Sequence, residues 1–496
     1  MDEVLIVGAG ISGIGMACHL RMNCPGKSFT ILERRHRIGG TWDLFKYPGI
    51  RSDADMFTFG YGFKRWKNRK ILGSAEAIRT YLEEAAEEHK VPEAIRFGQQ
   101  VTHASWSSEA CCWTVTAKDE ISGETLEYKA RFLVMGSGYY NHDAGYNPTL
   151  PKEDAFGGQI IHPQHWPENT DYSNKKVVII GSGATAVTLV PAMAKEAGHV
   201  TMLQRSPTYI ISIPEHDRVS PLLNIFLSEE RSNELIRRFY IRLFETLWGA
   251  SRRYPKAVRK LLMKLVERQV GKDNMEHFNP KYDPWDQRLC LVPRNDFFKA
   301  IRAGDASVET GHIERFTDKG ILLKSGSHID ADIVIKATGL ELQMLGGAQL
   351  SVDGLTKDIS KLMQFNGALI QDLPNFSWIF GYVSYPWTLK ADLVAKYVCR
   401  LLNHMDEKGF SAAIPVDEHN CTVHDAPFID VINAGYVKRG QHCLPRKGSR
   451  KPWLVLNDYR KDCVDLLEKA IEVPELKFMR LSVVGAKKEA QTRQVA

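Results

Sequence analysis

The sequence lacks several patterns that would define other classes of protein. Its nine cysteines include no C-x2-C or C-x4-C pair, and this scattered usage is typical of a reduced, cytoplasmic protein, which we expect here. No H-x-x-x-H pattern with a nearby carboxylate occurs, so we expect no metal site. No apolar run of about 20 residues predicts a transmembrane helix, and the first six residues enter a strand pattern without the basic region of a signal peptide.

The sequence also has no large net charge, because basic and acidic residues nearly balance at +6 over 496 residues. Residues 231–270 hold eleven Lys and Arg against three Glu, a local excess of basic groups rather than a nucleic-acid-binding composition. Helical periodicity over about 218–282 predicts a helical insertion. Two interpretations stay open for it: a solvated basic face, or peripheral membrane contact with anionic lipid or a lipophilic substrate pool.

A first glycine-rich fingerprint follows an apolar run at the N-terminus. It includes Gly8, Gly10, Ser12 and Gly13, and the next predicted strand ends in Glu33, 25 residues after Gly8. Glycines allow close approach of a pyrophosphate, the helix N-terminus supplies N–H donors, and Glu33 can accept from ribose hydroxyls. An acid at this place repels a 2′-phosphate, so the pattern favours FAD.

A second fingerprint follows the apolar run 177–180, and the strand after it ends in Gln204-Arg205-Ser206 rather than in an acid. Arg205 can pair with a 2′-phosphate, which predicts NADPH; the alternative is a solvated surface arginine. With Arg205 and Ser206, the residues predicted to contact this second cofactor are Gly181, Gly183, Ala184, Thr185 and Ala186.

Two more apolar runs end at a glycine. They span residues 131–138 and 332–339, and the second includes Thr338 and Gly339. We interpret them as the crossings between two domains. The predicted fold is α/β, with two Rossmann-like dinucleotide-binding domains and the helical insertion in the second. The FAD-binding domain would comprise residues 1–150 and 331–496, the latter with a C-terminal region, and the NADPH-binding domain residues 151–330.

Between the fingerprints lies the pattern F-x-G-x-x-x-H-x-x-x-W-P, and a second long pattern, G-G-T-W-D-L-F-K-Y-P-G-I-R-S-D, spans 39–53. Both resemble motifs of the type I Baeyer–Villiger monooxygenases, which are class B flavoprotein monooxygenases. The chain is most similar to the ethionamide-activating and long-chain-alkane-degrading members, over about residues 3–470. The fixed positions of the first pattern are Phe156, Gly158, His162, Trp166 and Pro167.

The resemblance implies a reaction. In this family NADPH reduces FAD, the reduced flavin takes O2 to give a C4a-peroxyflavin, and one oxygen atom is inserted beside a ketone carbonyl to give an ester or lactone. Sulfoxidation and thioamide oxidation are implied as side activities. Long aliphatic ketones, aryl ketones and sulfur compounds are the expected substrates, and the oligomeric state stays open.

Such chemistry needs a fixed positive charge beside the reactive oxygen, because preorganised charge costs no reorganisation during reaction. Arg288 matches the family's catalytic arginine, and a guanidinium stays charged at any working pH. Asp53 matches the carboxylate that positions it. The alternatives are a surface ion pair for Arg288, with Arg294 as competitor for its role, and a turn or cap for Asp53.

Predictions also concern the linker between the fingerprints and the surroundings of the flavin. The resemblance places His162 and Trp166 in a linker that positions the domains, rather than in acid–base chemistry. We expect Gly40, Thr41, Trp42 and Tyr47 to approach the flavin, with core aromatics as the alternative for Trp42 and Tyr47. Residues 381–392 are expected to line the flavin or substrate pocket.

One position departs from the family: Gln287 stands where many members carry a lysine that assists 2′-phosphate binding. Arg205 and Ser206 then carry most of the NADPH prediction.

Three other classes remain as alternatives. A disulfide reductase also binds FAD and NADPH but needs the missing cysteine pair. An N- or S-hydroxylating flavin monooxygenase shares the oxygen chemistry but not the full first pattern. A non-catalytic flavoprotein is disfavoured by the presence of Arg288 and Asp53.

Overall fold

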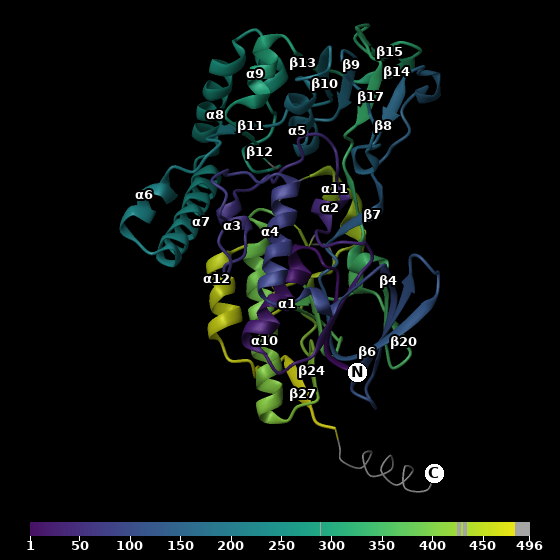
Figure 1. Cartoon of the computed structure of the whole chain (residues 1–496), viewed down its shortest axis with the longest axis vertical. Helices are drawn as coiled ribbons and strands as arrows, with labels where there is room; N and C mark the ends of the chain where they lie inside the picture. The colour runs from purple at the N-terminus through teal and green to yellow at the C-terminus, as the bar shows by residue number, and fades with distance from the viewer. Residues whose placement is uncertain (288, 424–427, 430–433, 482–496) are drawn as a thin grey trace.

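The computed structural model describes residues 1–287, 289–423, 428–429 and 434–481. Within them the chain forms two α/β lobes that follow one another along the long axis of the molecule (Figure 1). The larger lobe is built on an eleven-stranded sheet and the smaller on a five-stranded sheet. The predicted α/β class with two dinucleotide-type folds is therefore confirmed.

The centre of the larger sheet is formed by the strands around the first fingerprint. Strand β1 (Asp2–Val7) lies between β2 (Phe29–Glu33) and β6 (Thr125–Met135) and is parallel to both. Helix α1 (Ile11–Asn23) makes the crossover that a parallel β1–β2 pair requires. The carboxyl ends of β1 and β2 therefore meet at one edge of the sheet, beside the N-terminus of α1.

The larger sheet also draws on the C-terminal part of the chain. Strands β4 (Gln99–Ser107) and β5 (Cys112–Asp119) extend it as an antiparallel meander with β6. Strand β23 (Phe376–Trp378) then pairs with β6 from far along the sequence. The larger lobe is consequently assembled from two separate parts of the chain.

The smaller sheet has the order β13-β10-β9-β17-β8, and every pair is parallel. Its central strands are continuous apolar runs, as expected where helices cover both faces. The elements are β8 (Gln159–Ile161), β9 (Lys176–Ile180), α5 (Ala184–Met193), β10 (His199–Gln204), α9 (Asp296–Ala303), β13 (Ala306–Thr310) and β17 (Ile333–Lys336).

Strand β17 corrects the predicted change of domain at residue 330. Ile333 pairs with Val177 of β9 and with Gln159 of β8, so this strand belongs to the smaller sheet. A boundary at residue 330 falls one strand too early, because the strand is placed by register with distant neighbours rather than by its local sequence. After β17 the chain crosses back along β18 (Leu340–Leu342), which pairs antiparallel with β7 (Tyr140–Gly145), the outgoing crossing.

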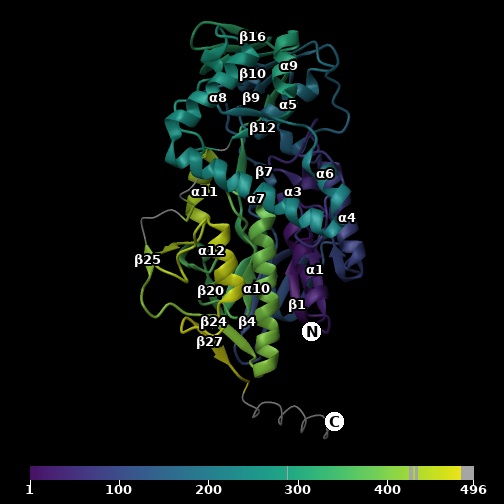
Figure 2. The ribbon, with the colours of Figure 1, turned by 90° about the vertical axis from the view of Figure 1, so that its left-hand side faces the viewer.

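The predicted helical insertion is confirmed as three helices. They are α6 (Val219–Phe226), α7 (Glu229–Arg253) and α8 (Pro255–Val270). The Ser228 side chain caps α7 by accepting from the Arg231 N–H, and Pro255 begins α8 at a position where its missing N–H costs nothing. In Figure 2 helix α7 crosses the side of the molecule that faces the viewer, between the two lobes.

The remaining elements complete the two lobes and their margins. The other helices of the larger lobe are α2 (Thr41–Leu44), α3 (Met56–Phe59), α4 (Ala75–Glu88), α10 (Trp387–Lys408), α11 (Gly435–Gly440) and α12 (Tyr459–Cys463). The other strands are β3 (Ile95–Phe97), β11 (Ile210–Ile213), β12 (Cys290–Pro293), β14 (Ile313–Thr317), β15 (Gly320–Leu323), β16 (His328–Asp330), β19 (Gln349–Val352), β20 (Leu355–Lys357), β21 (Gln364–Phe365), β22 (Leu369–Ile370), β24 (Ala412–Pro415), β25 (Thr422–Val423), β26 (Lys447–Gly448) and β27 (Leu476–Met479).

A buried ion pair joins α10 to α12. Lys390 Nζ lies 2.9 Å from Asp462 Oδ2, and both side chains are almost fully buried. The Tyr382 hydroxyl donates to the same carboxylate at 2.7 Å. Removing one partner of such a pair leaves the other charge in a medium that solvates it poorly.

We therefore expect Lys390→Met to lower the free energy of unfolding by about 3–5 kcal/mol. Chemical denaturation of the holoprotein measures the change. Lys461→Met is the matched control, because Lys461 forms an exposed pair with Asp458 and such pairs contribute about 0–1 kcal/mol. Equal losses in the two variants would contradict a special role for the buried pair.

Candidate dinucleotide sites and the junction between them

The first fingerprint forms a turn that accepts only glycine at two of its positions. Gly8 has φ +99°, and a Cβ on Gly13 would lie 1.8 Å from the Gly8 carbonyl oxygen. Gly10 is the N-cap of α1, and no side chain among the described residues caps it. The first N–H groups of α1 consequently face an open turn, which is the arrangement that binds a pyrophosphate.

Glu33, the last residue of β2, stabilises this turn through hydrogen bonds. Its Oε2 accepts from the Ala9 N–H at 2.6 Å, and its Oε1 accepts from the Arg35 N–H at 2.8 Å. Burial raises the pKa of the Glu33 carboxyl, while these two backbone hydrogen bonds oppose the shift. The carboxylate lies beside the fingerprint, where the sequence predicted it.

The beginning of the second motif lies against the same turn. A Cβ on Gly40, which has φ +55°, would lie 3.1 Å from the Gly10 Cα. Thr41 and Trp42 follow as the first residues of α2. Trp42 is partly buried and meets Phe59 edge-to-face at 5.7 Å, so at least part of its ring is a core contact.

Helix α10 is joined to the first fingerprint by a tryptophan. Trp387 Nε1 donates to Ser12 Oγ at 2.8 Å, and the ring stacks on Tyr139 with centroids 5.1 Å apart. Trp387 is the first residue of α10 and lies in the stretch 381–392 that was predicted to line the pocket. Sequence reasoning identified the stretch but not this contact.

The second fingerprint repeats the glycine turn in the smaller lobe. Gly181 has φ +137°, and a Cβ there would lie 2.3 Å from the Ala337 carbonyl oxygen at the end of β17. Gly183 caps α5 without a side-chain hydrogen bond from the described residues, and a Cβ on it would meet none of their atoms within 4 Å. The predicted Ala184, Thr185 and Ala186 form the first turn of α5.

The end of β10 lies beside this second turn. Ser182 Oγ donates to the Ser206 carbonyl oxygen at 3.2 Å, which ties the fingerprint to the segment after β10. Arg205 and Ser206 are both exposed there. Arg205 is thus accessible to a ligand at the second turn.

Residues 44–51 leave the first turn and pack against the smaller lobe. Tyr47 is buried in the core of that lobe, and a Cβ on Gly49 would lie 2.6 Å from the Ala192 Cβ of α5. Arg51 Nη1 forms an ion pair of 2.6 Å with Asp296, the first residue of α9. One motif therefore contacts both glycine turns.

Groups from its own motif and from α5 surround Tyr47 and affect its pKa. Burial raises the pKa of Tyr47 to about 12, the negative charge of Asp53 adds to the shift, and a hydrogen bond with the Thr185 side chain opposes it. Tyr47 thus lies between the end of its own motif and the first turn of α5. The sequence left Tyr47 between a flavin contact and a core aromatic; the structure places its ring in the core of the smaller lobe.

The pattern at 156–167 runs along β8 toward the crossings. A Cβ on Gly158 would lie 2.3 Å from the Asp332 carbonyl oxygen, and Phe156 packs with Phe316. Trp166 is partly buried against the core of the smaller lobe, and Pro167 is exposed.

His162 packs against the outgoing crossing β7, since a Cβ on Gly145 would lie 2.2 Å from its Cε1. Burial lowers the pKa of His162, which favours the neutral ring. On the returning side, Thr338 Oγ1 donates to the Tyr146 carbonyl oxygen at 2.5 Å, and the Tyr146 N–H donates to the Gly339 carbonyl oxygen at 3.0 Å. The predicted linker role of His162 and Trp166 stays a prediction.

Only one member of the predicted catalytic pair, Asp53, lies within the described residues. Asp53 is exposed at a bend two residues after Arg51. Arg288 lies outside the described residues, so its pairing with Asp53 stays a prediction. Arg294, the competitor, has a side chain 74% exposed, and its Nη1 lies 3.7 Å from Glu215 Oε2.

An aromatic cluster lies just before position 288. Phe244 of α7 meets Trp285 edge-to-face at 5.3 Å and Tyr385 at 4.7 Å between centroids. Trp248, one turn further along α7, lies 5.3 Å from Trp285. Trp285 stands two residues before Gln287 in the sequence, whereas Phe244 and Trp248 carried no signal beyond helical spacing.

A second set of residues missed by the sequence ties the insertion to the larger lobe. Arg237 Nη1 donates to the carbonyl oxygens of Phe57 at 3.0 Å and Gly60 at 2.7 Å. Its Nη2 lies 3.6 Å from Asp392 Oδ2, which also accepts from the Gly62 N–H at 2.7 Å. The insertion is thereby anchored to the segment that follows Asp53.

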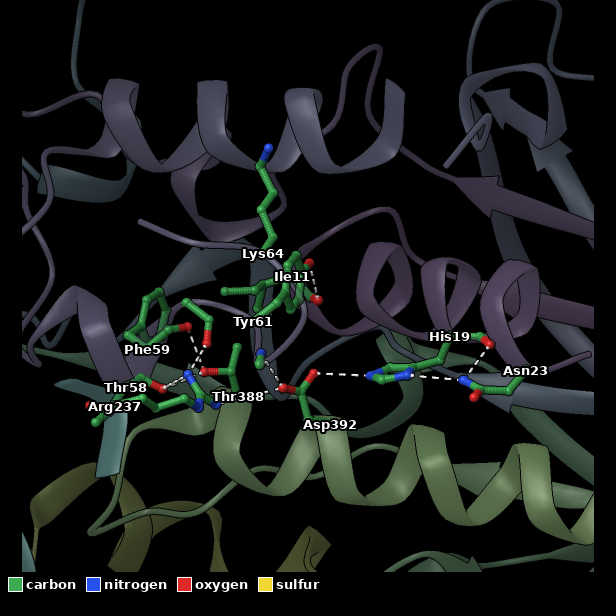
Figure 3. Close-up of polar contacts among 12 residues, drawn as sticks. Ile11, His19, Asn23, Thr58, Phe59, Tyr61, Lys64, Arg237, Thr388 and Asp392 are labelled. Carbon is green, nitrogen blue, oxygen red and sulfur yellow. Dashed lines mark hydrogen bonds and ion pairs between the residues drawn. The ribbon is translucent and has the colours of Figure 1, made fainter. Parts of the chain in front are cut away.

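Asp392 connects this anchor to the first fingerprint helix. Figure 3 shows Asp392 of α10 and His19 of α1 pointing toward one another, with His19 Nε2 3.3 Å from Asp392 Oδ1. Burial favours the protonated acid, yet the hydrogen bond from His19 and the charge of Arg237 hold the pKa of Asp392 below its ordinary value. The described part of the chain holds no cluster of three or more His, Cys, Asp or Glu suited to a metal ion.

Comparison with known proteins gives this geometry a family context. A family model described as pyridine nucleotide-disulphide oxidoreductase matches residues 5–241. The putative FAD-containing monooxygenase MymA of Mycobacterium tuberculosis is 51% identical over 481 residues, 96% of this chain and 97% of that protein. The probable FAD-binding monooxygenase AlmA of Acinetobacter baylyi is 50% identical over 462 residues, 93% of this chain and 92% of that protein. Among solved structures, an oxidized steroid monooxygenase bound to NADP aligns with a TM-score of 0.73 at 21% identity, over 97% of this chain and 99% of that one.

The anchor formed by Arg237 generates a prediction. Arg237→Gln removes the donors to the carbonyl oxygens of Phe57 and Gly60, so backbone amides over residues 55–62 should exchange with deuterium roughly 10- to 100-fold faster, since a hydrogen bond to a charged group contributes about 1.5–3 kcal/mol. Mass-spectrometric hydrogen exchange on the holoprotein measures this. Arg238→Gln, one residue on and exposed, should leave the exchange unchanged. Unchanged exchange in Arg237→Gln would contradict the anchor.

Proposed function

Because this chain belongs to the FAD-containing monooxygenases, we propose that it is an NADPH-dependent Baeyer–Villiger monooxygenase that converts ketones to esters or lactones with O2. The supporting observation is one motif, residues 39–53, that touches both glycine turns: Gly40 at the first and Tyr47 at the second. A monooxygenase of this type needs a flavin and a nicotinamide brought to one place, and this motif joins the two turns that would hold them.

FAD fits the first turn. The uncapped N-terminus of α1 offers its N–H groups to a pyrophosphate, Gly8 and Gly13 allow the turn and α1 to pack closely on the sheet, and Gly10 has no side chain to obstruct the ligand. Glu33 would accept from the ribose hydroxyls. When bound and reduced, FAD supplies the activation of O2 on which a monooxygenase depends.

NADPH fits the second turn, where the space around Gly183 is open at the start of α5. Arg205 and Ser206, exposed after β10, would hold the 2′-phosphate; a guanidinium matches a phosphate in charge and in bidentate geometry. Gln287 would contribute no charge to this recognition.

Arg288 and Asp53 would carry the oxygen chemistry. A fixed guanidinium stabilises negative charge that develops on oxygen, and it does so without reorganising during the reaction. Asp53 would orient this guanidinium and balance its charge. His162, whose neutral form is favoured by burial and which packs on the crossing β7, would position the lobes rather than transfer protons.

The aromatic cluster of Phe244, Trp248, Trp285 and Tyr385 supports an apolar substrate class. Half-buried rings from three segments lie together here, and Trp285 stands three residues before Arg288 in the sequence, so we infer that they offer apolar surface to a ligand. Aryl ketones and long aliphatic ketones match this chemistry, and organic sulfides would be oxidised as a side activity.

The proposal is tested by following NADPH oxidation with and without members of a ketone panel and identifying products by gas chromatography. We expect ester formation in step with substrate-dependent NADPH use. Uncoupled H2O2 as the sole product would contradict the proposal, and N- or S-oxygenated products without any ester would favour a heteroatom-hydroxylating enzyme instead.

Arg205→Ala tests the cofactor preference. Loss of a charged contact to the 2′-phosphate should raise the KM for NADPH roughly 10- to 100-fold while the KM for NADH changes little. Steady-state kinetics with both cofactors measure the split. Arg315→Ala, an exposed arginine elsewhere on the smaller lobe, is the control and should alter neither value. An unchanged KM for NADPH in Arg205→Ala would mean that the phosphate is held elsewhere.

Arg288→Ala tests the role in oxygen chemistry. Anaerobic reduction of the flavin by NADPH should persist near the wild-type rate, whereas ester formation should fall by about 100-fold or more, because a preorganised charge is lost. Arg294→Ala should retain ester formation, since that side chain is largely exposed and paired with Glu215. If Arg288→Ala formed ester at near the wild-type rate and Arg294→Ala lost this activity, the role in oxygen chemistry would belong to Arg294 instead of Arg288.

A further inference from the structure

Exposed apolar side chains are concentrated on the helical insertion. Of the nineteen large hydrophobic residues exposed within the described part of the chain, ten lie between Leu222 and Leu265. Scattered exposed hydrophobic residues are normal on a protein surface, but a contiguous cluster marks an interaction site. The insertion therefore carries a candidate binding surface.

Helix α7 has two faces with different neighbours. One face packs on the protein: Ile236 is buried, Arg237 holds the carbonyl oxygens of Phe57 and Gly60, and Tyr240 stacks on Phe57. A neighbouring face presents an exposed apolar stripe at i, i+4 spacing, which consists of Leu235, Phe239, Leu243 and Leu247.

Basic side chains flank this stripe. Leu235, Phe239 and Leu243 line an open groove of about 420 Å³ together with Thr246 and two arginines, Arg238 and Arg242. Glu234 pairs with Arg238 at 2.6 Å, so the positive charge along this edge is partly compensated. Over residues 231–270 eleven basic residues still outnumber three Glu, and most of the excess lies between Arg252 and Arg268, at the end of α7 and in α8.

Helix α6 continues the apolar face. Leu222, Ile225 and Phe226 are 63%, 69% and 82% exposed, and α6 lies against α7. Both helices stand at the margin of the molecule in Figure 1. No described helix is long and apolar enough to cross a bilayer, so a contact made by these helices would lie in the plane of the interface.

We propose that α6 and the exposed face of α7 dock the enzyme on the surface of an anionic lipid bilayer. Apolar residues would enter the boundary between headgroups and acyl chains, while arginines beside them meet anionic headgroups. A second copy of the chain is the alternative occupant, and sedimentation equilibrium distinguishes it from a membrane in the test below. The proposal is independent of the proposed reaction, since it concerns the outer face of the insertion.

The test is co-sedimentation of the holoenzyme with two kinds of vesicle, phosphatidylcholine alone and an equal mixture with phosphatidylglycerol, at about 0.15 M ionic strength. We expect binding to the anionic vesicles that is weak or absent on phosphatidylcholine alone. The double variant Phe239→Ser, Leu243→Ser should lower the partition coefficient roughly tenfold or more. Ile121→Ser, Leu355→Ser is the matched control, because it removes two exposed apolar side chains outside the insertion and should bind as the wild type does.

A second pair of variants tests the contribution of the arginines to vesicle binding. Arg238→Gln, Arg242→Gln should lower binding to anionic vesicles roughly tenfold, whereas Lys118→Gln, Lys361→Gln removes two exposed charges elsewhere and should not. Unchanged thermal midpoints and NADPH oxidation in solution show that the variants are folded. The proposal is overturned if the wild type ignores anionic vesicles, if the stripe variant binds like the wild type, or if sedimentation equilibrium shows a dimer that only the stripe variant dissociates. Because vesicle binding needs no turnover, its failure is distinguishable from failure of the proposed reaction.

Discussion

The packing of residues 44–51 on helix α5 is the contact on which the arrangement of the two lobes depends. Gly49 allows the backbone to approach Ala192 so closely that any Cβ would overlap it, and Arg51 secures the approach through Asp296. The same motif begins at Gly40, against the first fingerprint. A single short segment thus contacts both glycine turns and links their positions.

The helical insertion extends this framework from the outside. Arg237 binds the segment after Asp53 on one side of α7, and the aromatic side chains of Phe244 and Trp248 reach Trp285 further along the same helix. The exposed stripe occupies a neighbouring face of α7. One helix therefore contacts the segments that flank the predicted catalytic pair and also carries the exposed apolar side chains.

The sequence predicted the features that depend on local pattern. The glycines of both turns, Glu33 and the helical insertion were identified because strand, turn and helix signals are contiguous in the chain. Contacts between distant segments were not predictable: nothing near Arg237 indicates that it donates to Gly60, and nothing near Trp387 indicates Ser12. Strand β17 was assigned to the wrong lobe for the same reason, since its partner residues Gln159 in β8 and Val177 in β9 lie 174 and 156 residues before Ile333.

The central claim is that the joined glycine turns serve a single reaction in which one atom of O2 enters the substrate. The most direct measurement is turnover of a ketone with isotopically labelled O2 and NADPH, followed by mass spectrometry of the product. We expect an ester or lactone that carries one labelled oxygen atom, formed in proportion to the NADPH consumed. An ester without label, or NADPH consumption accounted for entirely by labelled H2O2, would contradict it.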